Sequence, residues 1–253
     1  GALRDGLTIP RMETFMIKHF FIALCGSLLA TLAGAQGVEA TIKKNIEATL
    51  PDGTKVEGVR KLGVLGLYEV LVGGDLLYTD EKATHVIVGQ IIEPKTQKNL
   101  TQERLDKLAQ IKFSDLPTDI AIKQVKGNGK RVIATFEDPN CGYCKKLAKD
   151  LQSLNDITIY TFLHPILSPD SLDKSKAIWC AADRAKAWND YMVNNKAPEA
   201  AKCDTAAVEK SMALARKLNI RGTPAIFLAD GTRIPGYMPA AKLEEAMAKA
   251  AGH

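Results

Sequence analysis

The chain has 253 residues, of which 46% are hydrophobic and 25% are charged, and its formal net charge is +5. These values are ordinary for a globular protein, and the length suits one large domain or two small ones. Because the positive charge is small and dispersed, the composition gives little support to a nucleic-acid partner, and we expect none.

The N-terminal segment 1–35 has the pattern of a secretory signal that is removed after export. Its uncharged, mostly apolar run 20–34 follows basic residues, and Ala33-Gly34-Ala35 fits a cleavage site before Gln36. An uncleaved membrane anchor is the alternative, because the uncharged run continues to Val38, although a bilayer span needs about 20 apolar residues. Removal of the segment leaves four of the five cysteines.

Residues 36–97 are expected to form a small α+β module. Segment 38–50 repeats apolar residues every four positions, which predicts a helix that ends at Pro51-Asp52-Gly53. A hairpin is predicted at Gly73-Gly74-Asp75. The strands of the module are expected at 55–62, 67–71, 76–79 and 85–88. A module of this size buries little core, and its unpaired strand edges favour a two-fold partner.

Residues 98–116 are expected to form a linker with a helix at 101–111, for which Thr101 is the expected N-cap. Residues 117–253 then alternate strands with helices. The strands are predicted at 120–125, 131–136, 157–162, 225–228 and 233–234, and the helices at 171–195, with a break near Asp183, at 206–218 and at 240–250.

The motif Cys141-Gly142-Tyr143-Cys144 lies between the strand at 131–136 and a lysine-rich helical segment that starts near Lys145. A helix N-terminus favours a thiolate, which is the form that attacks disulfides. We therefore expect Cys141 at the N-cap to be the exposed nucleophile, and Cys144, one turn further, to be shielded and to resolve a mixed disulfide. Half of a zinc site is the alternative, but the sequence holds no second CxxC and no HxxxH.

A second informative element is Gly222-Thr223-Pro224, which leads into the apolar strand at 225–228. Proline cannot donate a hydrogen bond to a sheet, so a Thr-Pro at this place is unusual. We expect Thr223-Pro224 to be a cis peptide that faces the redox motif. An ordinary trans turn is the alternative, since trans is the commoner state of any X-Pro bond.

Together these elements resemble the thioredoxin fold, and the order of elements after residue 117 is that of a thioredoxin core with a helical insertion. Segment 136–147 (FEDPNCGYCKKL), Gly222-Thr223-Pro224-Ala225 and the pair Cys180 and Cys203 resemble the DsbC/DsbG family of bacterial periplasmic disulfide isomerases. Gly-Tyr between the cysteines is similar to the DsbC branch, because DsbG-type proteins usually carry Pro-Tyr there. The N-terminal region matches the family by pattern only.

The resemblance implies an α+β protein with an N-terminal cystatin-like dimerisation domain at 36–97, a linker helix at 98–116 and a thioredoxin-like catalytic domain at 117–253. It implies a periplasmic homodimer that acts on misfolded disulfide-containing exported proteins and is reduced by a membrane thiol reductase of the DsbD type. No cofactor, metal or nucleic acid is expected. A dithiol oxidase of the DsbA type, a non-enzymatic chaperone and a copper(I)-binding protein are the alternatives.

The resemblance also assigns roles to single residues. Cys141 and Cys144 are expected to be catalytic, and the residues expected to bind substrate or support the site are Gly142, Tyr143, Thr223 and Pro224. Tyr143 has simple exposure as an equal alternative. Cys180 and Cys203 are interpreted as a structural disulfide, with a second redox pair as the alternative, because an even number of cysteines is typical of exported proteins.

The charged residues around the motif are interpreted mainly as solvated. Glu137 and Asp138 are expected to be exposed charges at the end of a strand, and a proton relay to Cys144 is the alternative for a carboxylate beneath the motif. Lys145, Lys146 and Lys149 are expected to form a solvated helix face, and a contribution of positive potential near the thiolate is the alternative.

Overall fold

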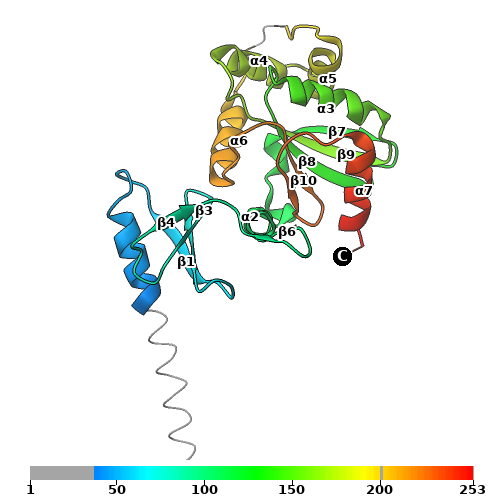
Figure 1. Cartoon of the computed structure of the whole chain (residues 1–253). Coiled ribbons are helices and arrows are strands. Elements are labelled where there is room, and N and C mark those ends of the chain that lie inside the picture. The colour runs from blue at the N-terminus through cyan, green and yellow to red at the C-terminus, as the bar shows by residue number, and fades with distance from the viewer. Residues whose placement is uncertain (1–36, 200–201, 253) are drawn as a thin grey trace, which may run out of the picture. The chain divides into compact units, whose positions relative to one another are not determined.

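The computed structural model describes residues 37–199 and 202–252, which divide into two compact units between Gln90 and Ile91 (Figure 1). The expected signal segment 1–35 lies outside the described residues. Among the residues that are described, no helix is long and apolar enough to cross a membrane. The sequence-based domain boundaries at 97/98 and 116/117 remain predictions.

The N-terminal unit contains a helix, of which residues 37–47 are described, and a four-stranded antiparallel sheet in the order β1-β2-β3-β4. The strands are β1 Val56–Lys61, β2 Tyr68–Val72, β3 Asp75–Thr79 and β4 Val86–Val88. The helix packs Ile42 and Ile46 against Val56, Tyr68 and Val70. This small core explains why the sequence pattern alternates only weakly along β1, which buries a single residue.

Strand β4 is the outer strand of this sheet, and its whole length is exposed. It carries Val86, Ile87 and Val88, and Val88 has an exposed fraction of 80%. Its backbone pairs on one side only, with β3. An apolar, unprotected edge of this kind is what proteins normally cover by pairing.

The C-terminal unit begins with a short pair, β5 Ile92–Glu93 and β6 Lys98–Asn99, followed by α2 Leu100–Ala109. The predicted N-cap Thr101 is wrong. The side chain of Asn99 caps the helix by accepting a hydrogen bond from the backbone N–H of Gln102, whereas Thr101 is buried and its hydroxyl accepts one from Ile91 N–H. The sequence does not reveal Asn99 as the N-cap, because this residue also ends strand β6.

The central sheet of this unit has five strands in the order β11-β10-β8-β9-β7. Strands β8 and β9 are parallel, and the other neighbours are antiparallel. The strands are β7 Ile122–Lys126, β8 Arg131–Glu137, β9 Ile157–Leu163, β10 Ala225–Leu228 and β11 Arg233–Ile234. The helices are α3 Gly142–Asp150, α4 Pro169–Trp179, α5 Arg184–Asn194, α6 Ala206–Lys217 and α7 Ala240–Ala250. Short 3-10 turns lie at Phe113–Asp115, Thr118–Ile120 and Leu151–Ser153.

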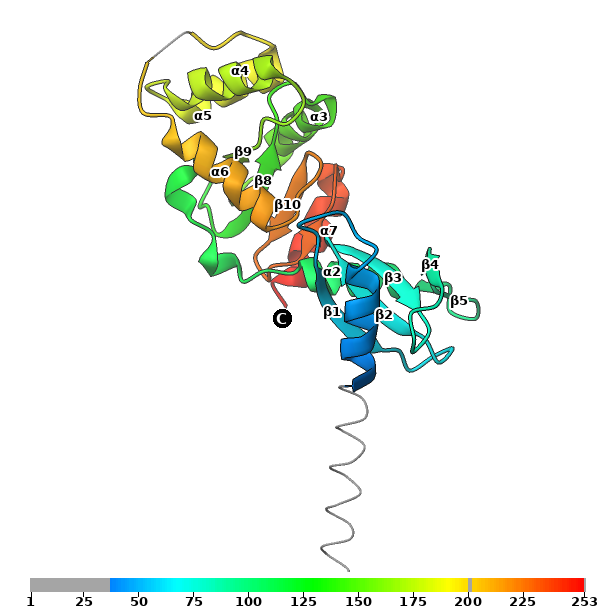
Figure 2. The same ribbon diagram turned by 90° about the vertical axis from the view of Figure 1, so that its left-hand side faces the viewer.

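Helices cover both faces of the sheet, with α6 on one side and α7 on the other (Figures 1 and 2). Alternation along β8 sends Ile133 toward α3 and α7, and Ala134 and Phe136 toward α6. The same alternation places Thr135 and Glu137 on the face of Ile133. A third cluster joins Cys144 of α3 to Trp188 of α5, so the inserted helices α4 and α5 cover the end of the sheet that carries the CxxC motif.

Candidate active site

Cys141 is positioned by the end of β8 and the start of α3. Its backbone N–H donates to the carbonyl of Asp138 at 3.0 Å, and its Sγ caps α3 by accepting a hydrogen bond from the backbone N–H of Cys144 at 3.3 Å. The two thiols are not bonded to each other. Cys144 is fully buried, as expected. The expectation that Cys141 is exposed is wrong, because only 6% of it is accessible.

The two thiols have pKa values shifted in opposite directions. The pKa of Cys141 is lowered to about 5, first because the Cys144 thiol donates a hydrogen bond to the thiolate. Burial opposes this shift, while the Thr223 side chain and backbone N–H groups of the helix start reinforce it. The pKa of Cys144 is raised, first by burial and then by the hydrogen bond that it gives to Cys141. At neutral pH the pair therefore consists of a thiolate nucleophile and a protonated neighbour.

Thr223 lies directly opposite the nucleophile, and Pro224 follows it just before β10. Strand β10 pairs with β8 so that Ala225 faces Phe136, which brings the residues before β10 to the motif. The Sγ of Cys141 lies 3.3 Å from the carbonyl oxygen of Thr223. The Thr223-Pro224 peptide is cis, as the sequence predicts.

Asp138 organises the loop that follows β9. It is fully buried, and its carboxylate accepts hydrogen bonds from the backbone N–H groups of Asn140, Ile166 and Leu167 at 2.7, 2.8 and 2.9 Å. This arrangement holds the exposed side chains of Ile166 and Leu167 beside the segment that leads into Cys141. The expectation that Asp138 is an exposed strand-end charge is wrong, because three backbone donors replace water around it.

Exposed apolar surface also lies on the motif itself. Tyr143 has an exposed fraction of 65%, and its ring stacks on that of Tyr237 with 6.1 Å between centroids. Lys146 and Lys149 are exposed, as expected of a solvated helix face, and Lys145 is half-buried. The ammonium groups of Lys145 and Lys146 also lie over aromatic rings, that of Tyr191 at 4.7 Å and that of Tyr237 at 4.5 Å. Such contacts hold the lysine side chains close to the helix surface.

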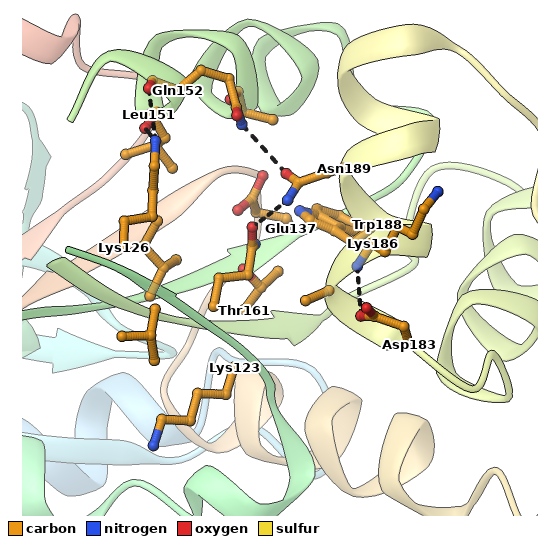
Figure 3. A pocket seen from close by; sticks show the side chains of 15 residues that line it. Lys123, Lys126, Glu137, Leu151, Gln152, Thr161, Asp183, Lys186, Trp188 and Asn189 are labelled. Atoms are coloured by element: carbon orange, nitrogen blue, oxygen red, sulfur yellow. Dashed lines mark hydrogen bonds between the residues drawn. The ribbon is translucent and has the colours of Figure 1, made fainter. Parts of the chain in front are cut away.

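Glu137 is the second acidic residue whose expected exposure is wrong. It is 1% exposed, because β8 continues to this residue and the inserted helix α5 covers it. The hydroxyl of Thr135 donates to its Oε1 at 2.7 Å. Burial raises the pKa of Glu137 to about 8, and the negative charge of Cys141 contributes to the shift. Its carboxyl group lies among the side chains of a cavity of about 230 Å³ (Figure 3).

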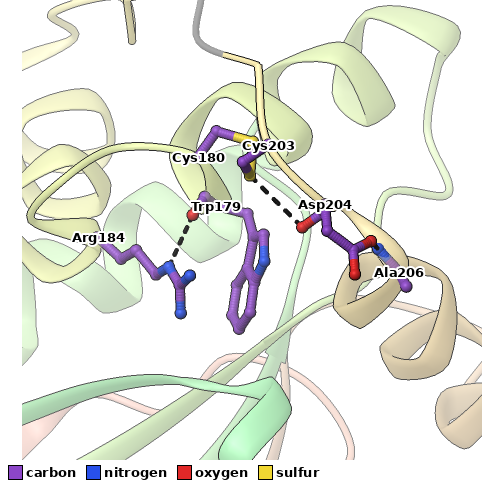
Figure 4. The surroundings of a disulfide bond; sticks show 6 residues. All are labelled: Trp179, Cys180, Arg184, Cys203, Asp204 and Ala206. Carbon is purple, nitrogen blue, oxygen red and sulfur yellow. Dashed lines mark hydrogen bonds between the residues drawn. A yellow bond between two sulfur atoms is a disulfide. The ribbon is translucent and has the colours of Figure 1, made fainter.

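Cys180 and Cys203 are joined by a disulfide bond with 5.5 Å between their Cα atoms. The bond connects the end of α4 to the segment that enters α6 (Figure 4). Next to it, Arg184 donates from Nε to the carbonyl of Trp179 at 2.7 Å and places its guanidinium 3.8 Å from the indole centroid. The disulfide thus lies in the helical insertion rather than at the CxxC motif.

Comparisons with known proteins match a protein family to each of the two units. The disulfide bond isomerase N-terminal domain family matches residues 33–102, and the thioredoxin-like domain family matches residues 118–251. These matches confirm the fold class expected from the sequence, an α+β N-terminal domain followed by a thioredoxin-like domain.

Individual relatives give the same result. The Probable thiol:disulfide interchange protein DsbC of Bordetella parapertussis is 53% identical over 193 residues, which are 76% of this chain and 68% of that protein. The thiol:disulfide interchange protein DsbC of Escherichia coli K12 is 31% identical and covers 87% of this chain and 92% of its own. The crystal structure of a disulfide interchange protein from Neisseria gonorrhoeae is 39% identical, with a TM-score of 0.51, over 53% of this chain and 98% of that chain.

Proposed function

The chain belongs to the DsbC family of thiol:disulfide interchange proteins, and from this premise we propose that Cys141 and Cys144 are its redox-active dithiol. The protein is a thiol–disulfide oxidoreductase of the disulfide isomerase class. The observation that carries the residue assignment is the opposite shift of the two pKa values at one helix start, where Cys141 has the lowered value and Cys144 the raised one.

The reaction begins when the Cys141 thiolate attacks a wrong disulfide in a substrate protein. A mixed disulfide forms between Cys141 and one substrate sulfur, and the other substrate sulfur leaves as a thiolate. A different substrate thiolate then attacks the mixed disulfide, which gives a rearranged substrate and restores Cys141. Alternatively Cys144 attacks Cys141, which releases a reduced substrate and leaves an enzyme disulfide.

The second route consumes two electrons, so the enzyme needs a thiol reductant. A membrane thiol reductase of the DsbD type fits this need, because the cell compartment proposed here is the periplasm, reached by means of the signal segment 1–35. Misfolded exported proteins are the proposed substrates. They expose apolar side chains, for which Tyr143, Ile166 and Leu167 offer apolar contacts around the nucleophile.

The N-terminal unit is proposed to form a homodimer. Its outer strand β4 has an unpaired edge and three exposed apolar side chains, and a second copy would cover them. Two catalytic units would then act on one substrate chain, which keeps a misfolded protein bound while a mixed disulfide rearranges.

Two assays on the mature protein test the proposed function. Insulin reduction measures release by Cys144, and recovery of activity from scrambled ribonuclease measures isomerisation. Cys141→Ser should abolish both. Cys144→Ser should abolish catalytic reduction and keep part of the isomerisation, because substrate thiols still resolve the mixed disulfide. A Cys141→Ser protein that restores ribonuclease as well as wild type would show a chaperone rather than a redox enzyme.

A further inference from the structure

His164 is a buried titratable residue that the reaction described above does not use. It directly follows strand β9, and only 2% of it is accessible. Its backbone N–H donates to the carbonyl of Glu137 at 2.8 Å, and Glu137 is the last residue of β8 before the turn that leads to Cys141. His164 is therefore held next to the segment that positions the nucleophile.

The hydrogen bond of the His164 ring fixes its tautomer. Nε2 lies 3.1 Å from the carbonyl oxygen of Ile220, whereas Nδ1 is buried and has no hydrogen-bond partner among the described residues. Because a carbonyl oxygen can only accept, Nε2 carries the hydrogen and Nδ1 is the bare nitrogen. Burial lowers the pKa of His164 and outweighs the opposing effects of the Ile220 carbonyl and the Asp138 charge, so the ring is neutral near pH 7.

The acceptor belongs to residues 218–224, here called the cis-proline loop, which lead from α6 to β10 (Figure 2). Two side chains hold three consecutive carbonyls at its start. Arg233 of β11 donates from Nη1 to the carbonyls of Leu218 and Asn219 at 3.2 and 3.3 Å. His164 donates to the next carbonyl, that of Ile220. The loop is thus fixed by side chains from two different strand ends.

His164 fixes the cis-proline loop close to the residue that meets the nucleophile. After Ile220 the loop passes through the exposed residues 221–222 and reaches Thr223. The carbonyl oxygen of Thr223 lies 3.3 Å from the Sγ of Cys141. A substrate sulfur that is bonded to Cys141 must therefore lie beside the backbone of this loop, and the position of the loop determines how the substrate chain is held.

His164 also begins a second loop beside the nucleophile. Residues 164–168 lead from β9 to α4 and carry the exposed side chains of Ile166 and Leu167, whose backbone N–H groups donate to Asp138. The hydrogen bond of the His164 ring therefore ties this loop to the cis-proline loop. A shift of one loop relative to the other would change the surface that a substrate chain meets.

We propose that His164 is a positioning residue, which holds the cis-proline loop against the loop 164–168 so that a substrate chain can bind beside Cys141. The proposal rests on the proposed function of Cys141 as the nucleophile. In this role the neutral ring exchanges no proton and donates one hydrogen bond throughout the reaction. Without it the carbonyl of the buried residue Ile220 loses its donor, and the loop must move to find another.

Two substrates separate binding of the substrate chain from attack by the thiolate. The aromatic disulfide DTNB has no peptide backbone, whereas insulin presents its disulfides within a chain. His164→Phe keeps an aromatic ring and removes the donor. We expect it to raise the KM for insulin reduction about tenfold with little change in kcat, since tenfold corresponds to about 1.4 kcal/mol, the size of one lost hydrogen bond.

The reaction with DTNB should be insensitive to the same substitution. Release of the first coloured thiolate reports attack by Cys141, which needs no contact with a substrate backbone. At pH 8 the nucleophile is ionised, because the pKa of Cys141 is about 5. His164→Phe should therefore release this thiolate at nearly the wild-type rate.

Two further variants distinguish positioning from general stability. His164→Gln should restore the KM, because its amide nitrogen reaches about as far as Nε2 and can donate to the same carbonyl. The matched control is Thr158→Val, at the other end of β9, which removes a hydroxyl that donates to the carbonyl of Gly129 at 2.9 Å. It loses a hydrogen bond of the same kind away from the motif and should leave the KM unchanged.

The wild-type protein tests the hydrogen bond without any substitution. ¹⁵N NMR of the histidine rings, assigned through bonds, should show the Nε2–H tautomer for His164 near neutral pH. An Nδ1–H tautomer or an imidazolium there would overturn the proposal. If His164→Phe does not fold, His164→Met takes its place in the assays, because the flexible Met side chain fills irregular space and has no donor.

The outcomes distinguish this inference from the proposed function. An unchanged KM for insulin in a folded His164→Phe, or an equal loss of rate with DTNB, would overturn the positioning role and leave the dithiol assignment intact. Failure of the wild-type protein to release thiolate from DTNB would instead remove Cys141 as the nucleophile.

Discussion

The Sγ atom of Cys141 lies 3.3 Å from the carbonyl oxygen of Thr223, although 82 residues separate them in the chain. The antiparallel pairing of β10 with β8 creates this contact, because β8 ends and β10 begins at the same end of the sheet. The nucleophile is therefore bounded on one side by its own helix start and on the other by the backbone of Thr223.

The first prediction concerns the side chain of Thr223, which helps to lower the pKa of Cys141. Thr223→Val keeps the shape of the side chain and removes the hydroxyl, which is buried without a hydrogen-bond partner of normal length in the described residues, so we expect the pKa of Cys141 to rise modestly above about 5. Alkylation of reduced protein near pH 5 should become slower, with little change at pH 8. Thr232→Val, in the turn between β10 and β11, is the control and should leave the alkylation profile unchanged.

The second prediction concerns the stability of the reduced protein as a function of pH. The pKa of Glu137 is raised from 4.5 to about 8, so its contribution to folding is fully present below about pH 4.5 and is lost as pH rises through about 8. Glu137→Gln should therefore be more stable than wild type by roughly 2–4 kcal/mol at pH 8 and similar to it near pH 4.

Urea unfolding of both proteins at several pH values measures this difference. Cys141 has the opposite dependence, since its lowered pKa makes stability rise with pH between about 5 and 9, but it is present in both proteins and largely cancels. A difference that does not depend on pH would show that Glu137 does not titrate in this range.

The residues that the sequence predicts well carry local signals. The CxxC pair follows a strand and starts a helix, so the N-cap position of Cys141 is readable from its neighbours. Strands β10 and β11 and helix α7 have their predicted bounds, because the turn at Asp230-Gly231 and the apolar spacing after Pro239 define them locally.

The burial of Glu137 and Asp138 could not be predicted from the sequence. A charge after an apolar strand normally faces water, and only the tertiary structure shows otherwise. Asp138 is enclosed by backbone donors of the loop at Ile166, and Glu137 by helix α5, which lies about fifty residues later in the chain. A signal was present in Trp188, since a large apolar residue in the insertion needs a covered surface on the sheet.

The third prediction concerns the disulfide between Cys180 and Cys203, which closes a loop with a sequence separation of 23. Replacing both cysteines by alanine should reduce the free energy of unfolding by roughly 3 kcal/mol in the chain-entropy model. Insulin reduction should remain largely intact, because the bond lies in the helical insertion. Loss of reduction without loss of thermal stability would instead identify the pair as a second redox centre.

The fourth prediction concerns the end of the linker. The backbone N–H of Ile111 donates to the carbonyl of Gly231 at 3.1 Å, and a Cβ atom on Gly231 would lie 1.7 Å from the carbonyl oxygen of Ile111. Gly231→Ala should therefore detach this segment and expose the Ile111 amide to hydrogen exchange. Gly236→Ala is the matched control, since both glycines have positive φ but a Cβ there meets nothing within 4 Å in the described residues.

Both substitutions should cost about 1–2 kcal/mol for the left-handed backbone, and only Gly231→Ala should cost more. Equal exchange at Ile111 in the two variants would show that the contact with the turn does not hold the linker.

The final prediction concerns the homodimer and combines a point variant with a truncation. Val88→Lys places a charge on the exposed edge strand β4, which should block strand pairing and give a folded monomer by light scattering. Val125→Lys, on the outer strand β7 of the other sheet, is the control and should leave the dimer intact.

A truncation that begins at Gln110 should also give a folded monomer, which consists of the catalytic unit alone. It keeps Ile111 and Phe113, which pack in the core beside α6, whereas a start at Leu116 would remove them. This monomer should reduce insulin at nearly the wild-type rate and isomerise scrambled ribonuclease poorly, because a single site releases the substrate before a second attack occurs. If Val88→Lys remains a dimer, the edge of β4 is not the interface, and if the truncation isomerises as well as the whole protein, dimerisation has no part in the isomerase reaction.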